Sequence, residues 1–235
     1  MGTGPMNTHT VKVFDDEIGR LRGLISQMGG LAEDAIANAM KALQRNDVAL
    51  AREVRAADKQ IDAIEAEVER LAVQIIALRA PMAIDLREVV AALKIAGVVE
   101  RIGDYAKNIA KRVPMIESEH RIEPISILPA MGRMASEMVH EVLDAFAARD
   151  FEAAMHVVES DAALDDFYDS IFRTLVTYMV ENPKTISQVA HLLFVAKNLE
   201  RIGDHATNVA EMVYFAATGT QMADRDRGGM QELES

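Results

Sequence analysis

Two copies of one short segment carry the side chains most able to do chemistry. The first copy reads ERIGDYAKNIA from Glu100 to Ala110, and the second reads ERIGDHATNVA from Glu200 to Ala210. Each residue of an α-helix turns by about 100°, so the first acid, the second acid and the amide share one helical face. These residues are Glu100, Asp104 and Asn108 in the first copy and Glu200, Asp204 and Asn208 in the second.

Oxygen ligands in this pattern are typical of a site for a hard cation. Carboxylates one helical turn apart can converge on one ion or bridge two, and asparagine adds a neutral carbonyl oxygen. Like charges at this spacing destabilise a helix by about 0.2–0.5 kcal/mol. Gly103 and Gly203 lie in mid-helix, where glycine costs about 1 kcal/mol relative to alanine. A cation would resolve both conflicts, whereas the alternative, an ordinary solvated acidic face, needs neither feature.

The preceding helix of each copy offers further oxygen ligands. Asp58 and Asp62 stand one turn apart beside an apolar stripe, and their counterparts in the second copy are Asp161 and Asp165. Asp85 is another candidate ligand, but the second copy has Thr185 at that place. We therefore expect Mg²⁺, Ca²⁺, Mn²⁺ or oxidised iron at each cluster, with poorer coordination in the second copy.

Two neighbouring residue types have open interpretations. Arg101 and Arg201 follow the first acid of each motif and turn to a different face, where an ion pair with an acid of the adjacent helix is the plain interpretation. His205 replaces Tyr105 and is either a nitrogen ligand or an ordinary surface histidine.

Apolar periodicity and its breakers predict six helices around these motifs. Asp47 is a candidate N-cap, Pro81 and Pro114 end helices, and Asn182-Pro183 marks another break. The only substantial linker runs over 117–129. The expected helices cover about 14–44, 47–79, 84–112, 131–147, 150–180 and 185–215.

The order of three helices, a linker and three helices is an internal repeat. A shift of about 100 residues superimposes the two ERIGD segments, and Asp47 corresponds in the same way to Asp150. We expect an all-α fold, a six-helix bundle made of two tandem and similar three-helix bundles, each able to bury a core of its own. The predicted units are 10–115, a linker 116–129, a second unit 130–218 and a mobile tail 219–235.

Composition excludes several classes of protein. The 235 residues include 25 Lys+Arg and 37 Asp+Glu, a formal net charge of −12. This balance argues against an extended nucleic-acid interface and against binding to an anionic membrane surface. The absence of cysteine excludes disulfides, thiolate metal sites and cysteine nucleophiles. Because no segment has the apolar length of a signal peptide or membrane span, we expect a cytoplasmic protein.

Several common catalytic motifs are absent from the sequence. It contains no phosphate-binding GxxxxGK[ST] loop, no HExxH and no GxSxG. A metal-dependent phosphoester hydrolase remains the rival function, because a carboxylate-bound metal pair can activate water. Di-iron oxidases instead place a Glu-x-x-His pattern inward, and neither ERIGD segment contains it.

The duplicated ERIGD segments, the Asp-x-x-Ile-Asp of the preceding helix and the three-plus-three helix plan closely resemble the PhoU family of phosphate-signalling regulators, over roughly residues 10–218. The resemblance implies a non-enzymatic, cytoplasmic negative regulator of phosphate uptake and of the phosphate regulon. It also implies multinuclear iron or zinc clusters at the Glu/Asp-x-x-x-Asp motifs. The implied partners are PstB, the ATPase subunit of the phosphate ABC transporter, and the sensor histidine kinase PhoR, so membrane association would be through partners only. A homodimer is left open.

Overall fold

The computed structural model describes residues 6–116 and 122–222, with side chains from residue 13 onward. Within these ranges the chain forms six long α-helices and three short 3₁₀ turns, and no strand. The helices are α1 (Met6–Arg45), α2 (Val48–Arg79), α3 (Ile84–Arg112), α4 (Leu128–Ala148), α5 (Phe151–Glu181) and α6 (Ile186–Thr218). The predicted all-α, six-helix fold is confirmed.

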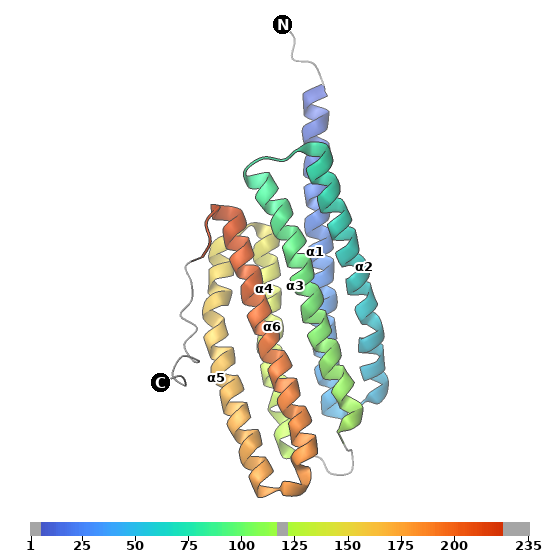
Figure 1. Ribbon diagram of the computed structural model, residues 1–235, viewed down its shortest axis with the longest axis vertical. Helices are drawn as coiled ribbons and strands as arrows, with labels where there is room; N and C mark the ends of the chain where they lie inside the picture. The colour runs from blue at the N-terminus through green and yellow to red at the C-terminus, as the bar shows by residue number, and fades with distance from the viewer. Residues whose placement is uncertain (1–5, 117–121, 223–235) are drawn as a thin grey trace, which may run out of the picture.

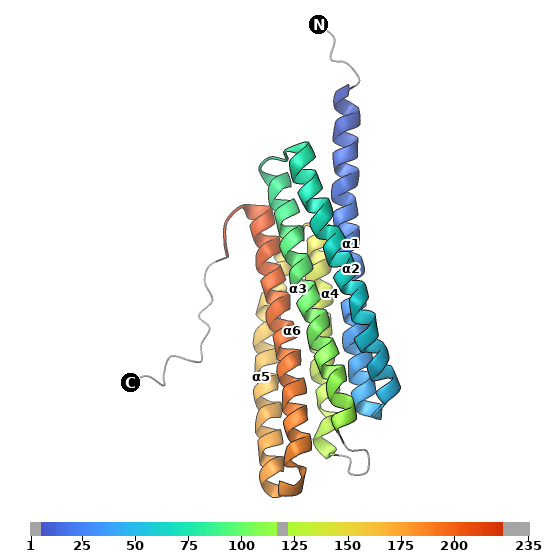
Figure 2. The same cartoon turned by 45° about the vertical axis from the view of Figure 1, so that its right-hand side comes forward.

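Four helices form the centre of the molecule and two flank it. α3 packs against α6 and α1 packs against α4, while α2 covers α1 and α3, and α5 covers α4 and α6 (Figures 1 and 2). The turn between α2 and α3 and the turn between α5 and α6 lie at opposite ends of the bundle (Figure 1). The two three-helix units are therefore related by an approximate twofold rotation, with α3 and α6 antiparallel at its centre.

Equivalent turns begin the second helix of each unit. The Asp47 carboxylate accepts a hydrogen bond from the Leu50 amide at 3.0 Å, and Asp150 does the same for Ala153 at 3.0 Å. The residues just before them, Asn46 and Arg149, both have positive φ, at 51° and 57°. The predicted cap at Asp47 is confirmed, and the repeat extends to the backbone conformation of the turn.

Two helices start earlier than the sequence pattern predicts. α1 begins at Met6 rather than near residue 14, and α4 begins at Leu128 rather than near 131. The predicted linker includes Pro129, but proline fits the first turn of a helix, where its missing N–H has no partner to lose. Residues 117–121 of the expected linker and 223–235 of the expected tail lie outside the described residues.

The buried side chains form one continuous core across both units. Ile25 and Ile36 of α1, Ile102 of α3 and Leu199 of α6 are fully buried members of it. The two units therefore share one core over the described residues. α3 and α6 place their apolar stripes against each other, so each unit completes the core of the other.

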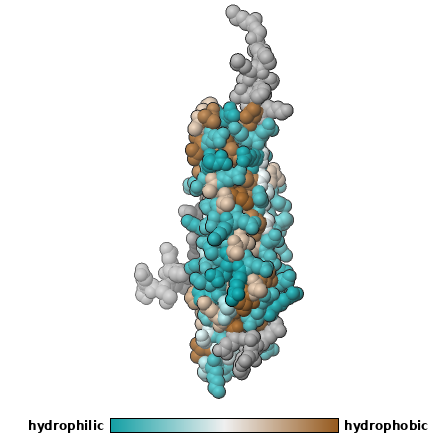
Figure 3. All heavy atoms as spheres, turned by 90° about the vertical axis from the view of Figure 1, so that its right-hand side faces the viewer, coloured by the Kyte–Doolittle hydropathy of each residue, from teal (hydrophilic) through white to brown (hydrophobic). Residues whose placement is uncertain are grey.

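The outer side of α1 and α2 is mostly polar. Figure 3 shows hydrophilic side chains over most of this face, with an apolar patch at the upper end, towards the turn between α2 and α3. Leu78, Met82 and Ile84 are exposed apolar residues of that turn. None of the helices, over the ranges that the structure describes, is both long and apolar enough to cross a membrane.

Candidate functional site

The acids of the first ERIGD motif lie along the contact between α2 and α3. We call this group the first acidic seam: Asp58, Asp62 and Glu65 of α2 with Glu100 and Asp104 of α3. Burial raises the pKa of Glu100, and the carboxylates of Asp104, Glu65, Asp62 and Asp58 raise it further. The predicted ligands of the two helices are thus brought together, and Glu65, one turn after Asp62, joins them without having been predicted.

Glycine sets the distance between the two helices at the seam. A Cβ atom on Gly103 would lie 2.7 Å from the Ile61 side chain of α2, and a Cβ on Gly203 would clash with Leu164 of α5. The inference that a cation accounts for these mid-helix glycines is therefore wrong. They are needed for close helix packing, which in turn brings Asp58 beside Asp104.

A lysine that the sequence analysis missed lies among the acids of the first seam. Lys107 Nζ is 2.5 Å from Asp58 Oδ2 and 3.0 Å from Asp104 Oδ1. Hydrogen bonds to these two carboxylates raise the pKa of Lys107. The sequence signal was available, because Lys107 follows Asp104 by one helical turn and shares its face.

The second acidic seam consists of Asp161 and Asp165 of α5 with Glu200 and Asp204 of α6. Burial raises the pKa of Glu200, a hydrogen bond from Lys197 at 2.5 Å opposes this, and Asp204 and Asp165 raise it again. The second oxygen of Glu200, Oε2, is buried and accepts no hydrogen bond. At the place of Lys107 this copy has Thr207, whose hydroxyl donates to the Asp204 carbonyl at 2.7 Å.

Three predicted ligands lie apart from these contacts or at the edge of the seams. Asp85 is exposed in the first turn of α3, about 22 Å along the helix from Glu100. Asn108 is exposed and Asn208 is half-buried, each one turn beyond the second acid of its motif. Within the described side chains, no three Asp, Glu or His groups are positioned to share one ion. Instead, Lys107 forms ion pairs with carboxylates of the first seam, and Lys197 forms one with Glu200 of the second.

His205 points towards the other repeat. Its Nδ1 lies 2.8 Å from the Arg201 carbonyl oxygen, so this nitrogen carries the proton, and its ring packs edge-on against Tyr105 at 5.1 Å. Burial lowers the pKa of His205. The positive charge of Arg101 opposes the rise in the pKa of Glu65 that burial and nearby acids cause, so Arg101 lies near this acid of the adjacent helix.

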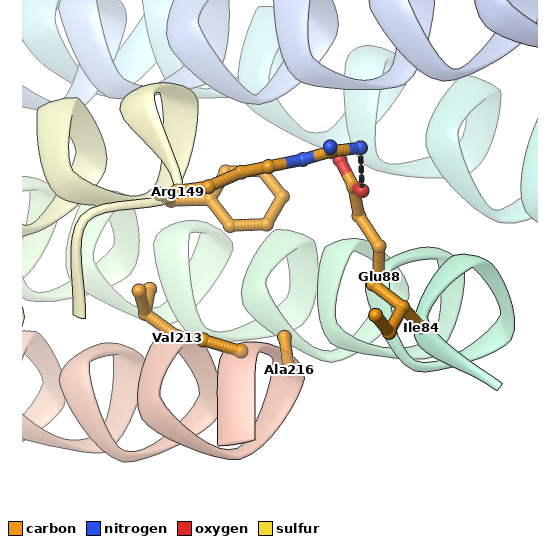
Figure 4. Close-up of a pocket in the computed structure, with 7 residues that line it drawn as sticks. Ile84, Glu88, Arg149, Val213 and Ala216 are labelled. Atoms are coloured by element: carbon orange, nitrogen blue, oxygen red, sulfur yellow. Dashed lines mark hydrogen bonds and ion pairs between the residues drawn. The ribbon is translucent and has the colours of Figure 1, made fainter. Parts of the chain in front are cut away.

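A separate small pocket lies between the repeats. Figure 4 shows Ile84 and Glu88 of α3, Arg149 after α4, and Val213 and Ala216 of α6 around it. Its volume is about 50 Å³, which suits water rather than a substrate, since ligand pockets measure roughly 300–1,000 Å³. Glu88 is buried and forms ion pairs with Arg149 and with Arg22 of α1, so the polar contacts at this pocket join the two repeats.

Comparisons with known proteins agree with this duplicated architecture. The PhoU domain matches residues 25–113 and again 128–213. A phosphate-specific transport system accessory protein PhoU homolog of Zymomonas mobilis is 57% identical, covering 94% of this chain and 93% of that protein. A protein of the same name from Caulobacter vibrioides is 45% identical, covering 94% and 96%.

Solved structures show the same fold. The crystal structure of PhoU from Pseudomonas aeruginosa superimposes with a TM-score of 0.84 at 38% identity, covering 88% of this chain and 100% of that one. The phosphate transport system regulatory protein PhoU from Streptococcus pneumoniae gives a TM-score of 0.83 at 25% identity, covering 89% and 99%. The family match to both repeats, with these relatives, shows that the chain belongs to the PhoU family.

Proposed function

We propose that this protein is a non-enzymatic, metal-binding negative regulator of phosphate uptake. Its family and the names of its relatives support a role as an accessory protein of phosphate transport. In the finer form of the proposal, the protein acts in the cytoplasm and connects the transporter ATPase PstB to the sensor kinase PhoR when phosphate is plentiful.

The observation that carries the metal proposal is the charge balance of the first acidic seam. Burial raises the pKa of Glu100, and the four other carboxylates of the seam raise it further by repulsion. The Lys107 ammonium neutralises only part of this charge. A divalent or trivalent cation would neutralise more of it, and carboxylate oxygens suit Mg²⁺, Mn²⁺, Ca²⁺ or oxidised iron.

The second seam supports the same proposal from a different observation. The buried Glu200 Oε2 has no hydrogen-bond donor, an arrangement that costs free energy unless some group compensates it. A metal ion there would accept this oxygen together with a carboxylate of Asp204 or Asp165. Iron and zinc are the metals that family membership favours.

In this proposal the metal acts by changing the surface offered to partners. Glu100 and Glu200 would ligate the ions directly, and Lys107 and Lys197 would release their carboxylates on loading. The two acidic seams would then become neutral or positive, while the helices behind them stay packed. A partner could thus distinguish the loaded from the empty protein.

Elemental analysis of protein isolated without chelator tests the metal proposal. We expect Glu100→Gln with Asp104→Asn to remove metal from the first seam, and Glu200→Gln with Asp204→Asn to remove it from the second. Glu53→Gln changes an exposed acid of α2 outside the seam and should leave the metal content unchanged. Equal metal in the seam variants and the parent protein would exclude these residues as ligands.

Lys107→Met separates competition from simple loss of structure. If the ammonium and the metal compete for Asp58 and Asp104, this variant should bind Mn²⁺ more tightly than the parent protein, because the acids lose their internal cation. Weaker binding in Lys107→Met would instead show that the lysine supports the site.

The regulatory part of the proposal needs its own experiment. Pull-downs with detergent-solubilised transporter and kinase should recover both, and the seam variants should recover less. Phosphate uptake should rise in cells carrying the seam variants. Light scattering on metal-loaded and metal-free protein would show whether a homodimer forms. Failure to recover either partner would contradict the bridging role without bearing on metal binding.

A further inference from the structure

The two ERIGD motifs face each other between the acidic seams. α3 and α6 run antiparallel side by side (Figures 1 and 2). The ring contact between Tyr105 and His205, at 5.1 Å, joins equivalent positions of the two motifs. The approximate twofold axis of the molecule therefore passes beside these rings, and any residue near them has a counterpart across the axis.

Arginines from both helices surround this ring pair. The Arg201 guanidinium lies over the Tyr105 ring, 5.9 Å from its centre. Burial is the main cause that lowers the pKa of His205. The positive charges of Arg101 and Arg201 lower it further, so both guanidinium groups lie near the His205 ring. Further along the same contact, the Arg112 guanidinium lies 4.3 Å from the centre of the Phe194 ring.

A guanidinium that stacks on a ring still has N–H donors to offer. These groups lie in its plane and point away from its centre, so stacking holds the fork in place and leaves its edge for an oxyanion. Arg101 and Arg201 are exposed and Arg112 is half-exposed, so the forks face water. The contact between α3 and α6 thus presents oriented donors from two helices.

The positive charges form an elongated group along one face of α3. Lys94, Arg101 and Arg112 share nearly the same helical angle and span about 27 Å. We call these three residues, with Arg201 of α6, the arginine strip. The chain has a net charge of −12. A strip of positive charge between two acidic seams therefore differs in sign from the electrostatic potential around it.

We propose that the arginine strip binds a condensed phosphate chain. Two guanidinium groups on opposite sides of a twofold axis need an acceptor whose oxygens point in more than one direction. A tetrahedral phosphate meets this need, whereas a carboxylate has two coplanar oxygens. Lys94 and Arg112 lie about 10 and 16 Å along α3 from Arg101 and would contact more distant units of a longer chain. Because the strip offers four cations, a chain of several linked phosphates can contact more of them than one phosphate can.

The same chemistry has two sources, free polyphosphate and the triphosphate of a nucleotide. Calorimetric titration of metal-free, full-length protein with sodium tripolyphosphate, ATP, sulfate and poly-glutamate separates them. We expect tripolyphosphate to bind at least ten times more tightly than sulfate. ATP equal to tripolyphosphate would assign the strip to nucleoside triphosphates, and weaker ATP binding would assign it to free polyphosphate. Either result supports the proposal.

Variants locate the binding site. Arg101→Gln with Arg201→Gln should weaken tripolyphosphate binding at least tenfold, because both central forks are lost. Arg173→Gln, an exposed arginine of α5 away from the strip, is the matched control and should change nothing. In NMR spectra of the parent protein, the His205 ring signals should shift during the titration, and those of the exposed His156 should not.

Three results would overturn the proposal. Binding unchanged in the Arg101 and Arg201 double variant would place the ligand elsewhere. Binding that requires added metal would place the phosphates on ions of the acidic seams, and would leave the proposed metal function intact. Poly-glutamate as tight as tripolyphosphate would make the strip a surface for an acidic protein segment instead.

Discussion

At the scale of single residues, the motif glycines determine how closely the acids approach each other. Gly103 lacks the one carbon that would push Ile61, and with it α2, away from α3. A helix with alanine there would have the better intrinsic propensity, so tertiary packing has overruled local preference.

Replacing Gly103 by alanine should therefore destabilise the protein by about 1–3 kcal/mol, in spite of the gain in helix propensity, because overpacking outweighs it. Gly23→Ala is the matched control. It changes an exposed mid-helix glycine with no atom near the new carbon, and it should stabilise by about 0.5–1 kcal/mol. Urea unfolding measures both. Equal stabilisation by the two alanines would refute the packing account.

His140 of α4 provides a pH-dependent contact with α1. His140 Nδ1 donates a hydrogen bond to the Glu33 carboxylate at 3.3 Å, and this bond is the main cause that raises the pKa of His140 above 6.5. Because the pKa of His140 is raised on folding, the stabilisation from its protonated form is fully present below pH 6.5. It is lost as the pH rises through the pKa of His140 in the folded protein. The ring is 60% exposed, so solvent screening keeps the effect small.

Glu33→Gln should lower the pKa of His140 towards its ordinary value, as NMR titration of the ring would show. The pH dependence of stability between pH 6 and 8 should flatten in the same variant. A His140 pKa that is unchanged in Glu33→Gln would mean that Asp144 or Glu141 holds the charge instead.

At the scale of secondary-structure elements, Glu88 joins three parts of the chain. It extends from α3, and its partners are Arg22 of α1, with Nε 2.6 Å from Oε1, and Arg149 in the turn before α5. Glu88 is only 6% exposed, so its charge depends on these two arginines.

Replacing both arginines by methionine should destabilise the protein by about 3–5 kcal/mol, because a buried carboxylate would be left without a partner. Adding Glu88→Met to that double variant should restore most of the loss, since apolar groups of similar size can replace a buried ion pair. Denaturant unfolding of the three proteins checks this. No recovery in the triple variant would show that the arginines act through their own packing.

At the scale of the whole molecule, the shared core makes the two repeats interdependent. Separating them would expose the faces of α3 and α6 and of α1 and α4 that the continuous core now buries. We therefore expect the stability of each repeat to depend on the other.

Residues 1–119 and 120–235 expressed separately should each be poorly folded, and together they should form a one-to-one helical complex. Gel filtration and circular dichroism would show the difference. A first half that unfolds cooperatively as a monomer would contradict the shared core.

Much of the fold could be predicted from local patterns. The apolar period and caps such as Asp47 predicted α2, α3, α5 and α6 closely, because helix ends depend on neighbouring residues. Within the seams, the acids at one-turn spacing were found by the same means. Glu65 and Lys107 were missed. The periodicity of a helix shows which of its residues share a face, but it does not show which residues of the neighbouring helix contact that face.

The sequence alone determined that the chain is helical and duplicated, and that each repeat carries a row of acids on one helical face. Only the tertiary structure decided that α2 covers the row of Glu100, that a lysine shares it, and that Tyr105 meets His205 across the molecule. The reason is physical: helix formation and residue phase depend on contacts within a few turns, whereas the pairing of faces depends on how all six helices bury their apolar stripes at once.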